Sequence, residues 1–286
     1  MSGKVKYIIG SGWWCDKPGT PISNTGRVLH GDDEIRSADF HQLWYKSICE
    51  NSSPEKIVIV DSCSPVKPNL NEYDTRIEFI QLNENAGHST RHKGKYCGWM
   101  RSVLVGLSYA MNSDCEYFVY VEQDVLMKGK GLIESEIQHM TSRCLFGRQK
   151  GLVQPLQQSM FIVKKNWIET FLCRLYSIRA ADNRISPERK FAIASSRLLS
   201  LMPEFLFWQP KLNHIVGKLT HRLQTAVLKL FRAFGTLRMG YGRERPIEFS
   251  DKYFYFQHGS REELTQYLDL SNTKPTRFDE SSDELS

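Results

Sequence analysis

The chain has 286 residues, enough for one large α/β domain or two small ones, and its hydrophobic content of 41% and charged content of 24% are those of an ordinary globular protein. Its seven cysteines are scattered without a C-x-x-C pair, so we expect neither a zinc site nor a disulfide framework, and a reducing, cytoplasmic setting is favoured. The start of the chain does not resemble a signal peptide, and no apolar stretch approaches the length of a helix that crosses a bilayer.

The first segment predicts a strand followed by a helix. Residues 6–9 predict the strand, which leads into Gly10-Ser11-Gly12 and then Trp13 and Trp14. A G-x-G after a strand suggests a dinucleotide fold, but Cys15 occupies the place of the third glycine, so we reject the Rossmann fingerprint. Small residues still allow a ligand to approach, and the tryptophans either stack on a base or sugar or pack in the core. A helix is expected over residues 37–49, with Ser37 as its N-cap.

Two more strands are predicted before a long polar loop. Residues 56–60 are apolar and end at Asp61 and Ser62, whose oxygens either bind a nucleoside or cap a turn. Residues 76–82 alternate as a third strand, and a helix is expected over residues 99–111. The loop between them is basic, so it is either an anion site at a helix N-terminus or a solvated loop. Its candidate residues are Gly87, His88, Arg91 and Lys95.

Residues 117–126 hold two carboxylates at the end of a buried strand. Aromatic and β-branched residues predict the strand, and Glu122 and Asp124 follow its apolar run. On an extended backbone these two side chains point to the same side, where they repel each other unless a cation lies between them. Oxygen ligands suit Mg²⁺ or Mn²⁺, and such an ion would hold a phosphate. A solvated acidic turn is the alternative.

The second half continues the alternation. Short strands are predicted over residues 151–155 and 159–163, and a helix over residues 167–176. A further helix is expected to begin at Ser186, with Pro187 and Glu188 in its first turn. Glu188 there either stabilises the helix dipole or acts as a general base.

The net charge of +6 is unevenly distributed along the chain. Residues 205–243 contain no Asp or Glu, and within them apolar residues fall on one helical face with basic residues opposite. Such a helix binds a membrane surface or faces an acidic ligand, and no nucleic-acid module accompanies it. Two interpretations fit Gly242, Arg243 and Arg245: they bind a diphosphate, or they form a turn with solvated arginines. A last strand over residues 253–257 ends at His258, and a helix follows over residues 262–270.

Taken together, these pieces resemble the GT-A fold of nucleotide-sugar glycosyltransferases over most of residues 4–270. That family carries an acidic D-x-D at a strand end, of which Glu122-Gln123-Asp124 is a variant, and a glycine-containing loop before it, matched by Asn85-Ala86-Gly87. A late histidine is matched by His258, and residues 240–246 are similar to the family's diphosphate-gripping loops. The resemblance implies a Rossmann-type α/β/α sandwich with a mostly parallel central sheet and a helical, basic C-terminal region.

The domain organisation implied is one catalytic domain over residues 1–270. Residues 1–126 would form its nucleotide-binding half and residues 127–270 its acceptor-binding half, which includes the basic helical segment 199–240. Residues 271–286 are rich in Ser, Asp and Glu and are expected to be a disordered acidic tail.

The function that the resemblance implies is metal-dependent transfer of a sugar from a nucleoside-diphosphate sugar to an acceptor hydroxyl, with inversion expected and retention left open. Glu122, Asp124 and His258 would hold Mn²⁺ or Mg²⁺, and Glu188 would be the catalytic base, with Asp182 the second choice. The nucleotide and its diphosphate would be bound by Asp61, Ser62, Gly87, His88, Arg91, Lys95, Gly242, Arg243 and Arg245.

The partners implied are the donor and a glycan or lipid-linked acceptor, with no nucleic acid. Peripheral contact of a cytoplasmic protein with a membrane stays open. Two other functions remain as alternatives, a sugar-phosphate nucleotidyltransferase and a non-catalytic protein that binds polyanions or membrane surfaces.

Overall fold

The computed structural model describes residues 5–17, 30–90, 92–147, 154–210, 213–239 and 245–272. Within these residues, seven strands form one sheet in the order β3-β2-β1-β4-β7-β6-β8, and β5 pairs with β9 in a small second sheet. The strands are β1 (Tyr7–Trp13), β2 (Lys56–Asp61), β3 (Ile77–Gln81), β4 (Tyr117–Val121), β5 (Val125–Lys128), β6 (Cys144–Gly147), β7 (Gln157–Lys164), β8 (Gly235–Thr236) and β9 (Phe254–Gln257).

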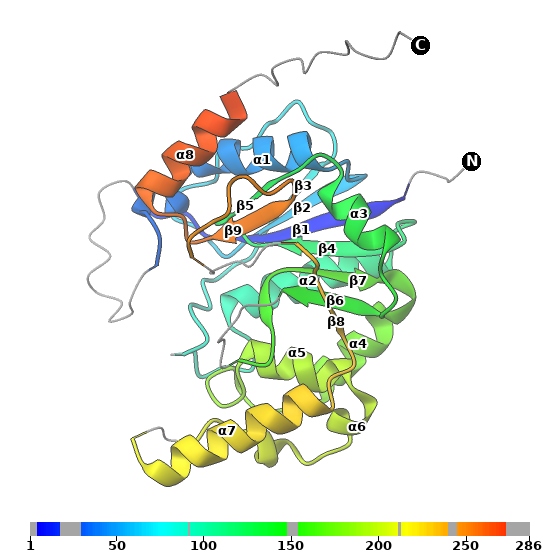
Figure 1. Cartoon of the computed structure of the whole chain (residues 1–286). Helices are drawn as coiled ribbons and strands as arrows, with labels where there is room; N and C mark the ends of the chain where they lie inside the picture. The colour runs from blue at the N-terminus through cyan, green and yellow to red at the C-terminus, as the bar shows by residue number, and fades with distance from the viewer. Residues whose placement is uncertain are drawn as a thin grey trace, which may run out of the picture.

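Helices flank the sheet on both faces (Figure 1). They are α1 (Phe40–Asn51), α2 (Gly98–Met111), α3 (Leu132–Gln138), α4 (Lys165–Ser177), α5 (Pro187–Ser195), α6 (Arg197–Ser200), α7 (Ile215–Leu230) and α8 (Arg261–Asn272), with the 3-10 helices η2 (Asp33–Arg36) and η3 (Glu204–Phe207). None of the described helices is both long and apolar enough to cross a membrane.

The strand order contains a topological switch point between β1 and β4. β1 pairs in parallel with β2 and β4, and β2 pairs in parallel with β3. The chain therefore moves outward from β1 to β3 and then returns to β4 on the other side of β1. β7 is antiparallel to β4 and to β6, so the sheet is mixed and mostly parallel. The predicted α/β class is confirmed, and the switch point marks the edge where ligands bind in open α/β sheets.

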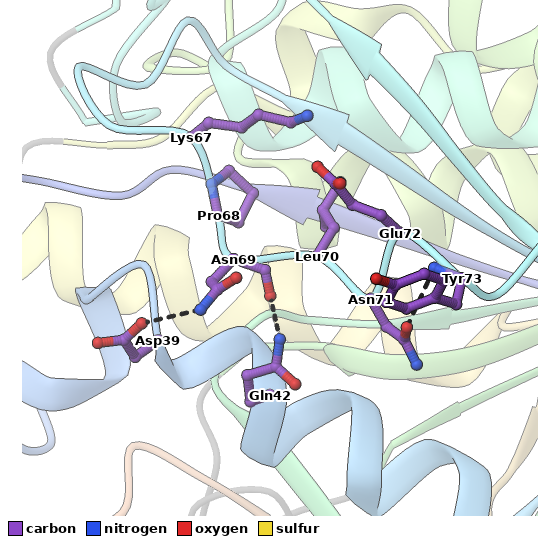
Figure 2. Close-up of a pocket in the computed structure, with 9 residues that line it drawn as sticks. All are labelled: Asp39, Gln42, Lys67, Pro68, Asn69, Leu70, Asn71, Glu72 and Tyr73. Carbon is purple, nitrogen blue, oxygen red and sulfur yellow. Dashed lines mark hydrogen bonds between the residues drawn. The ribbon is translucent and has the colours of Figure 1, made fainter.

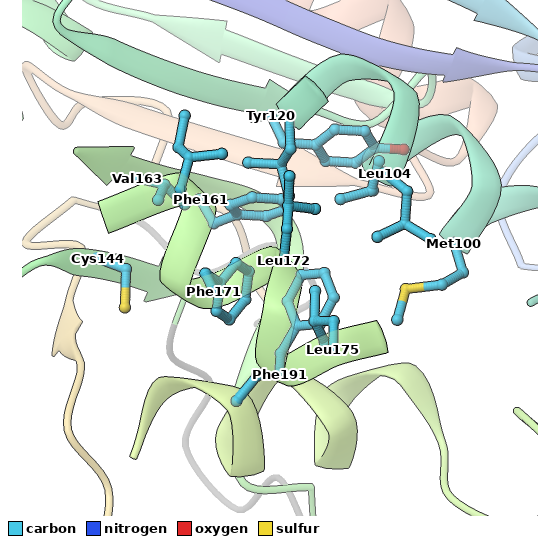
Figure 3. Close-up of a cluster of buried hydrophobic side chains, with 14 of the residues drawn as sticks. Met100, Leu104, Tyr120, Cys144, Phe161, Val163, Phe171, Leu172, Leu175 and Phe191 are labelled. Carbon is cyan, nitrogen blue, oxygen red and sulfur yellow. The ribbon is translucent and has the colours of Figure 1, made fainter. Parts of the chain in front are cut away.

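The core on one face of the sheet is built from aromatic rings between β7 and helices α4 and α5. Figure 3 shows Phe161, Phe171 and Phe191 converging there. The rings of Phe161 and Phe191 meet edge to face at 5.5 Å, and those of Phe171 and Phe191 at 5.3 Å. Edge-to-face pairs align the positive ring edge with the negative ring face. These contacts hold α5, which carries Glu188, firmly against the sheet.

The glycines of β1 serve packing rather than ligand approach. A Cβ at Gly12 would lie 2.8 Å from the Cβ of Ser102 on α2, so only glycine lets this helix lie so close to the strand. Trp13 is buried and packs edge to face on Trp44, with ring centroids 5.6 Å apart. Of the two interpretations of these residues, the structure therefore supports core packing for Gly12 and Trp13.

Several expected elements differ from those observed. β1 continues to Trp13, beyond the expected end at residue 9, and α1 begins at Phe40, after Asp39, and not at the expected N-cap Ser37. The apolar run expected to continue as one strand is interrupted, because β4 ends at Val121 and the chain turns before β5 begins at Val125 in the other sheet. The amide of Val125 donates to the carbonyl of Glu122 at 3.0 Å, which closes that turn. The strand expected over residues 151–155 lies mostly outside the described residues, as does nearly all of the expected tail.

Candidate functional site

Gln123, between the two carboxylates, anchors the end of β4 to the segment after β1. Its side-chain oxygen accepts from the amide of Trp14 at 2.7 Å, and its nitrogen donates to the carbonyls of Trp14 and Ile35, each at 3.2 Å. These bonds lie at the switch point and fix the turn that carries Glu122 and Asp124. In the sequence, Gln123 stands only as the middle residue between Glu122 and Asp124. The one local sign of its anchoring role is that its side-chain amide can both donate and accept hydrogen bonds at a strand end.

Asp124 and His258 are brought together from distant parts of the chain. Nδ1 of His258 lies 2.6 Å from Oδ2 of Asp124, and both side chains are largely buried. β5 follows Asp124 and pairs antiparallel with β9, which precedes His258, so the small sheet sets this pair. His258 has φ 58°, a left-handed conformation that few residues other than glycine, Asn, Asp and His adopt and that occurs at functional sites.

The segment that begins at His30 closes over His258. The rings of His30 and His258 lie 5.4 Å apart, and the amide of Asp32 donates to the carbonyl of Gly259 at 2.8 Å. Gly31 has φ 76°, and a Cβ there would lie 2.9 Å from the backbone of His258. Glycine at this position therefore permits the close approach, which sequence reasoning did not detect because nothing local marks it.

Glu122 is held by a row of buried amides. Its Oε2 accepts from Nε2 of Gln257 at 2.7 Å, and Oε1 of Gln257 accepts from Gln157 at 3.0 Å. The Gln157 oxygen in turn accepts from the hydroxyl and the amide of Ser159. The row fixes the Glu122 carboxylate to Gln257, which directly precedes His258 in the chain. The structure thus joins two of the three expected metal ligands, Asp124 and His258, and it places Glu122 and Asp124 on a turn after β4 and not on extended backbone.

The fit of these residues to Mn²⁺ or Mg²⁺ follows from their chemistry. Among the described residues no group of three His, Cys, Asp or Glu side chains has the arrangement of a complete metal site. Both ring nitrogens of His258 are buried, and neither has a well-aligned hydrogen bond among the described residues. Nδ1 faces the Asp124 carboxylate. These ions are commonly bound through one or two protein ligands, with waters and substrate phosphates completing the shell. The Asp124–His258 pair fits such a site.

The residues after β2 form a closed turn. Asp61 is fully buried, and its carboxylate accepts from the amide of Ser64 at 2.9 Å and from the Ser64 hydroxyl. Of the two interpretations of Asp61, the geometry matches the capped turn. Ser62 lies beside the start of α2, where a Cβ at Gly98 would be 3.2 Å from the Ser62 hydroxyl.

The loop before α2 places Gly87 at the start of that helix. The amide of Gly98 donates to the carbonyl of Gly87 at 3.0 Å, and Gly87 has φ 64°, which a glycine adopts without strain. His88 is exposed in the same loop, and its ring contacts the Thr90 hydroxyl at 3.0 Å. Gly87 and Ser62 therefore flank the positive end of a helix dipole. Arg91, Gly242 and Arg243 lie outside the described residues, so their expected roles remain expectations.

Two expected cations have other partners. The Lys95 ammonium donates to the carbonyl of Tyr176 near the end of α4 at 2.7 Å, and burial lowers the pKa of Lys95 below its ordinary value. Arg245 pairs with the Glu263 carboxylate in α8 and donates to the carbonyl of Gln257 at 3.0 Å. Lys95 thus contacts the C-terminal end of α4, whereas Arg245 contacts the backbone that leads into His258.

Asp182, expected as the second-choice base, lies in an environment that favours a structural role. Its carboxylate pairs with the Lys190 ammonium at 2.6 Å, with both side chains fully buried, and accepts from the amide of Cys97 at 2.6 Å. The ammonium also donates to the carbonyl of Lys95 at 3.0 Å. A general base must reach the acceptor hydroxyl, and Asp182 is instead enclosed where it joins α5 to the start of α2.

Glu188 is half-buried in the first turn of α5. Its charge, with that of Asp182, acts on Cys97 at the α2 N-terminus, where burial is the main cause that raises the pKa of the thiol. Glu188 therefore faces the same end of α2 as Gly87 and Ser62. No hydrogen bond between Glu188 and the Asp124–His258 pair is present in the described part of the chain.

Two hollows open near this edge of the molecule. One of about 850 Å³ is lined by His258, Arg245, Gly31 and the start of α8, so it opens directly beside the Asp124–His258 pair. The other, of about 730 Å³, lies between the start of α1 and residues 67–73, and Figure 2 shows Asn69 bonded across it to Asp39 and Gln42. None of the expected site residues lines this second hollow, so we do not assign it to the site.

Comparison with known proteins finds structural similarities but shows no family for this chain. No family model matches the sequence, and no curated protein matches it. Among solved structures, the galactosyltransferase LgtC, in complex with donor and acceptor sugar analogues, is 11% identical with a TM-score of 0.45, covering 95% of this chain and 98% of that one. S. aureus TarS 1–349 is 13% identical with a TM-score of 0.40, and the match covers 72% of this chain but only 56% of the TarS chain.

A Bacillus anthracis glucose-1-phosphate thymidylyltransferase, solved with sucrose, is 8% identical with a TM-score of 0.38, covering 96% of this chain and 97% of that one. These are similarities of fold, to glycosyltransferases and to a nucleotidyltransferase alike. At these identities and TM-scores the reaction has to be argued from the side chains of this chain.

Proposed function

We propose that the chain is a metal-dependent glycosyltransferase that moves a sugar from a nucleoside-diphosphate sugar to the hydroxyl of a glycan or a lipid-linked acceptor. The observation that carries the proposal is the Asp124–His258 pair, 2.6 Å apart at the switch point of the sheet and beside a hollow of about 850 Å³. The Asp124 carboxylate suits Mn²⁺ or Mg²⁺, and the His258 imidazole is a common ligand of divalent metal ions.

In this proposal Asp124 and His258 hold the ion and Glu122 adjusts their surroundings. When bound there, the ion neutralises negative charge on the leaving nucleoside diphosphate. Gln257 holds Glu122 by a bond of 2.7 Å, so the second carboxylate stays oriented whether or not it contacts the ion. Gln123 keeps the whole turn in place through its bonds to Trp14, which reduces the reorganisation needed when the donor binds.

Glu188 remains the proposed base, and Asp182 is withdrawn. Glu188 is half-buried in the first turn of α5, so one side of its carboxylate can meet an acceptor hydroxyl. Asp182 supports it indirectly, because its ion pair with Lys190 fixes the same helix against α2. The α2 N-terminus, flanked by Gly87 and Ser62, offers the positive end of its dipole to an anionic group of the donor.

A thermal-shift panel tests the donor site. UDP, GDP, CMP and their sugars would each be added with and without Mn²⁺, because a ligand that binds only the folded state raises Tm. We expect a metal-dependent rise with one nucleoside diphosphate, lost in Asp124→Asn and kept in the matched control Asp33→Asn on the exposed 3-10 helix η2. A rise that needs no metal and survives in Asp124→Asn would contradict the proposed site, as would no rise with any nucleotide.

Product analysis separates the two kinds of transferase. Release of nucleoside diphosphate from a nucleotide sugar supports glycosyl transfer, whereas release of pyrophosphate from a nucleoside triphosphate and a sugar phosphate would indicate a nucleotidyltransferase instead. Glu188→Gln should abolish transfer while the donor-induced rise in Tm is kept. Near-normal transfer by Glu188→Gln would show that the base is another residue.

A further inference from the structure

Helix α7 is attached to the rest of the chain by a narrow face. Thr225 and Leu228 are its buried residues, and it packs against α5. Gln224 fastens the helix, since its side-chain oxygen accepts from Arg189 of α5 at 2.7 Å and its nitrogen donates to the carbonyl of Leu206 in η3 at 2.8 Å. Figure 1 shows α7 at the lower edge of the molecule, at the opposite extremity from α8.

Five large apolar residues of α7 point away from the protein. Their side chains are between 65% and 84% exposed, and they are Ile215, Val216, Leu219, Leu223 and Leu230. At 3.6 residues per turn these positions fall within about 100° of arc, and the centre of that arc is opposite Leu228. An ordinary domain helix buries its apolar arc, and this helix exposes it. A contiguous exposed apolar surface of this kind marks a binding face.

The charge along this surface indicates an anionic occupant. Lys218 and Arg222 are exposed along one edge of the apolar arc, with Lys229 further along the same edge. No Asp or Glu occurs between residues 205 and 243, so the segment that carries Lys218 and Arg222 is basic along its length. A second copy of the same face would bring basic residues against basic residues. An anionic surface with an apolar interior satisfies both features of the helix.

The 3-10 helix η3 extends the apolar surface on the other edge. Phe205, Leu206 and Trp208 are all exposed there, and Gln224 bonds to the carbonyls of Leu206 and Trp208. The Arg184 guanidinium stacks over the Trp208 ring at 4.9 Å. An aromatic ring beside a cation is the pairing that anchors proteins at the level of lipid headgroups.

We propose that α7 and η3 form a docking surface for an anionic lipid bilayer, with α7 lying in the plane of the interface. Its apolar arc enters the boundary between headgroups and acyl chains, while Lys218 and Arg222 contact lipid phosphates. The docking itself does not require the proposed transferase activity, whereas its effect on the site rests on that activity. It also orients the site, because Arg189 joins α7 to α5, the helix that carries Glu188. An acceptor held in the bilayer would therefore approach Glu188 from the side of α7.

Vesicle flotation of the full chain tests the proposal. The probes are vesicles of phosphatidylcholine alone and vesicles that also contain phosphatidylglycerol. We expect flotation with the anionic vesicles that weakens as salt is raised. Leu219→Gln/Leu223→Gln should lower the partition coefficient by roughly tenfold for each leucine, and Lys218→Gln/Arg222→Gln by roughly fivefold for each cation on anionic vesicles only. Tyr73→Ser, which removes another exposed apolar side chain far along the chain, is the matched control and should float like the wild type.

Three results would overturn the proposal. The wild-type chain could stay at the bottom of the gradient with both kinds of vesicle, or the leucine variant could float as well as the wild type. A concentration-dependent dimer in sedimentation velocity, lost in Leu219→Gln/Leu223→Gln, would show instead that a second copy covers α7. Circular dichroism of each variant checks that the fold is kept, and the nucleotide-induced rise in Tm, measured without vesicles, reports separately on the proposed donor site.

Discussion

The buried ion pair between Asp182 and Lys190 makes a strong prediction about stability. Replacing Asp182 with Asn preserves the shape of the side chain and an acceptor for the Cys97 amide, but removes the charge opposite an ammonium that is fully buried. An uncompensated charge inside a protein costs about 3–5 kcal/mol. For a chain of this size, about 2 °C per kcal/mol gives a fall in Tm of roughly 6–10 °C.

The assay is denaturant unfolding of the wild type, Asp182→Asn and the double variant Asp182→Asn/Lys190→Met. The double variant removes both charges while keeping an unbranched apolar stem, so it should recover at least half of the lost free energy of unfolding. Glu78→Gln is the matched control, because it breaks an ion pair with Lys56 whose side chains are 36% and 41% exposed and should cost less than about 1 kcal/mol.

Activity measured below the unfolding midpoint decides between structure and catalysis. If Asp182→Asn is as stable as the wild type and yet inactive, the structural role argued for Asp182 is wrong and the carboxylate acts in the reaction. If it is destabilised and remains active while folded, the ion pair is structural. If Asp182→Asn is stable but inactive, the double variant shows whether a local rearrangement around Lys190 causes that loss of activity.

Three further predictions concern pH, the switch point and helix packing. Burial lowers the pKa of His41 to about 4, whereas the unfolded state binds the proton with the ordinary pKa of 6.5. The free energy of unfolding should therefore fall by about 3 kcal/mol as pH falls from 6.5 to 4, and His41→Gln should reduce this pH dependence in urea titrations. Gln123→Ala should speed hydrogen exchange of the Trp14 amide and cost about 1–3 kcal/mol, whereas unchanged exchange would argue against the anchoring role. Gly12→Ala should cost about 1–3 kcal/mol by pushing α2 off β1, with partial recovery in Gly12→Ala/Ser102→Gly; additive effects of the two changes would contradict a direct contact.

Local pattern was sufficient for three elements of the first half. The strands over residues 56–61 and 77–81 and the helix over residues 98–111 lie within a residue or two of their expected bounds, because apolar periodicity is a property of neighbouring residues. The break after Val121 could not be predicted from apolar periodicity. Both flanking segments are apolar, and only pairing with β7 on one side and β9 on the other shows that they belong to different sheets.

The sequence by itself determined the α/β alternation and the positions where carboxylates follow strands, since both depend on the order of residues along the backbone. Tertiary structure decided which polar groups meet. It joined Asp124 to His258, placed Lys190 against Asp182, and turned the apolar arc of α7 outward. The physical reason is that a polar side chain has many possible partners of similar energy, and the strand order and helix packing select among them. An amphipathic pattern likewise states that a helix has two faces, but only the packed structure shows which one meets the protein.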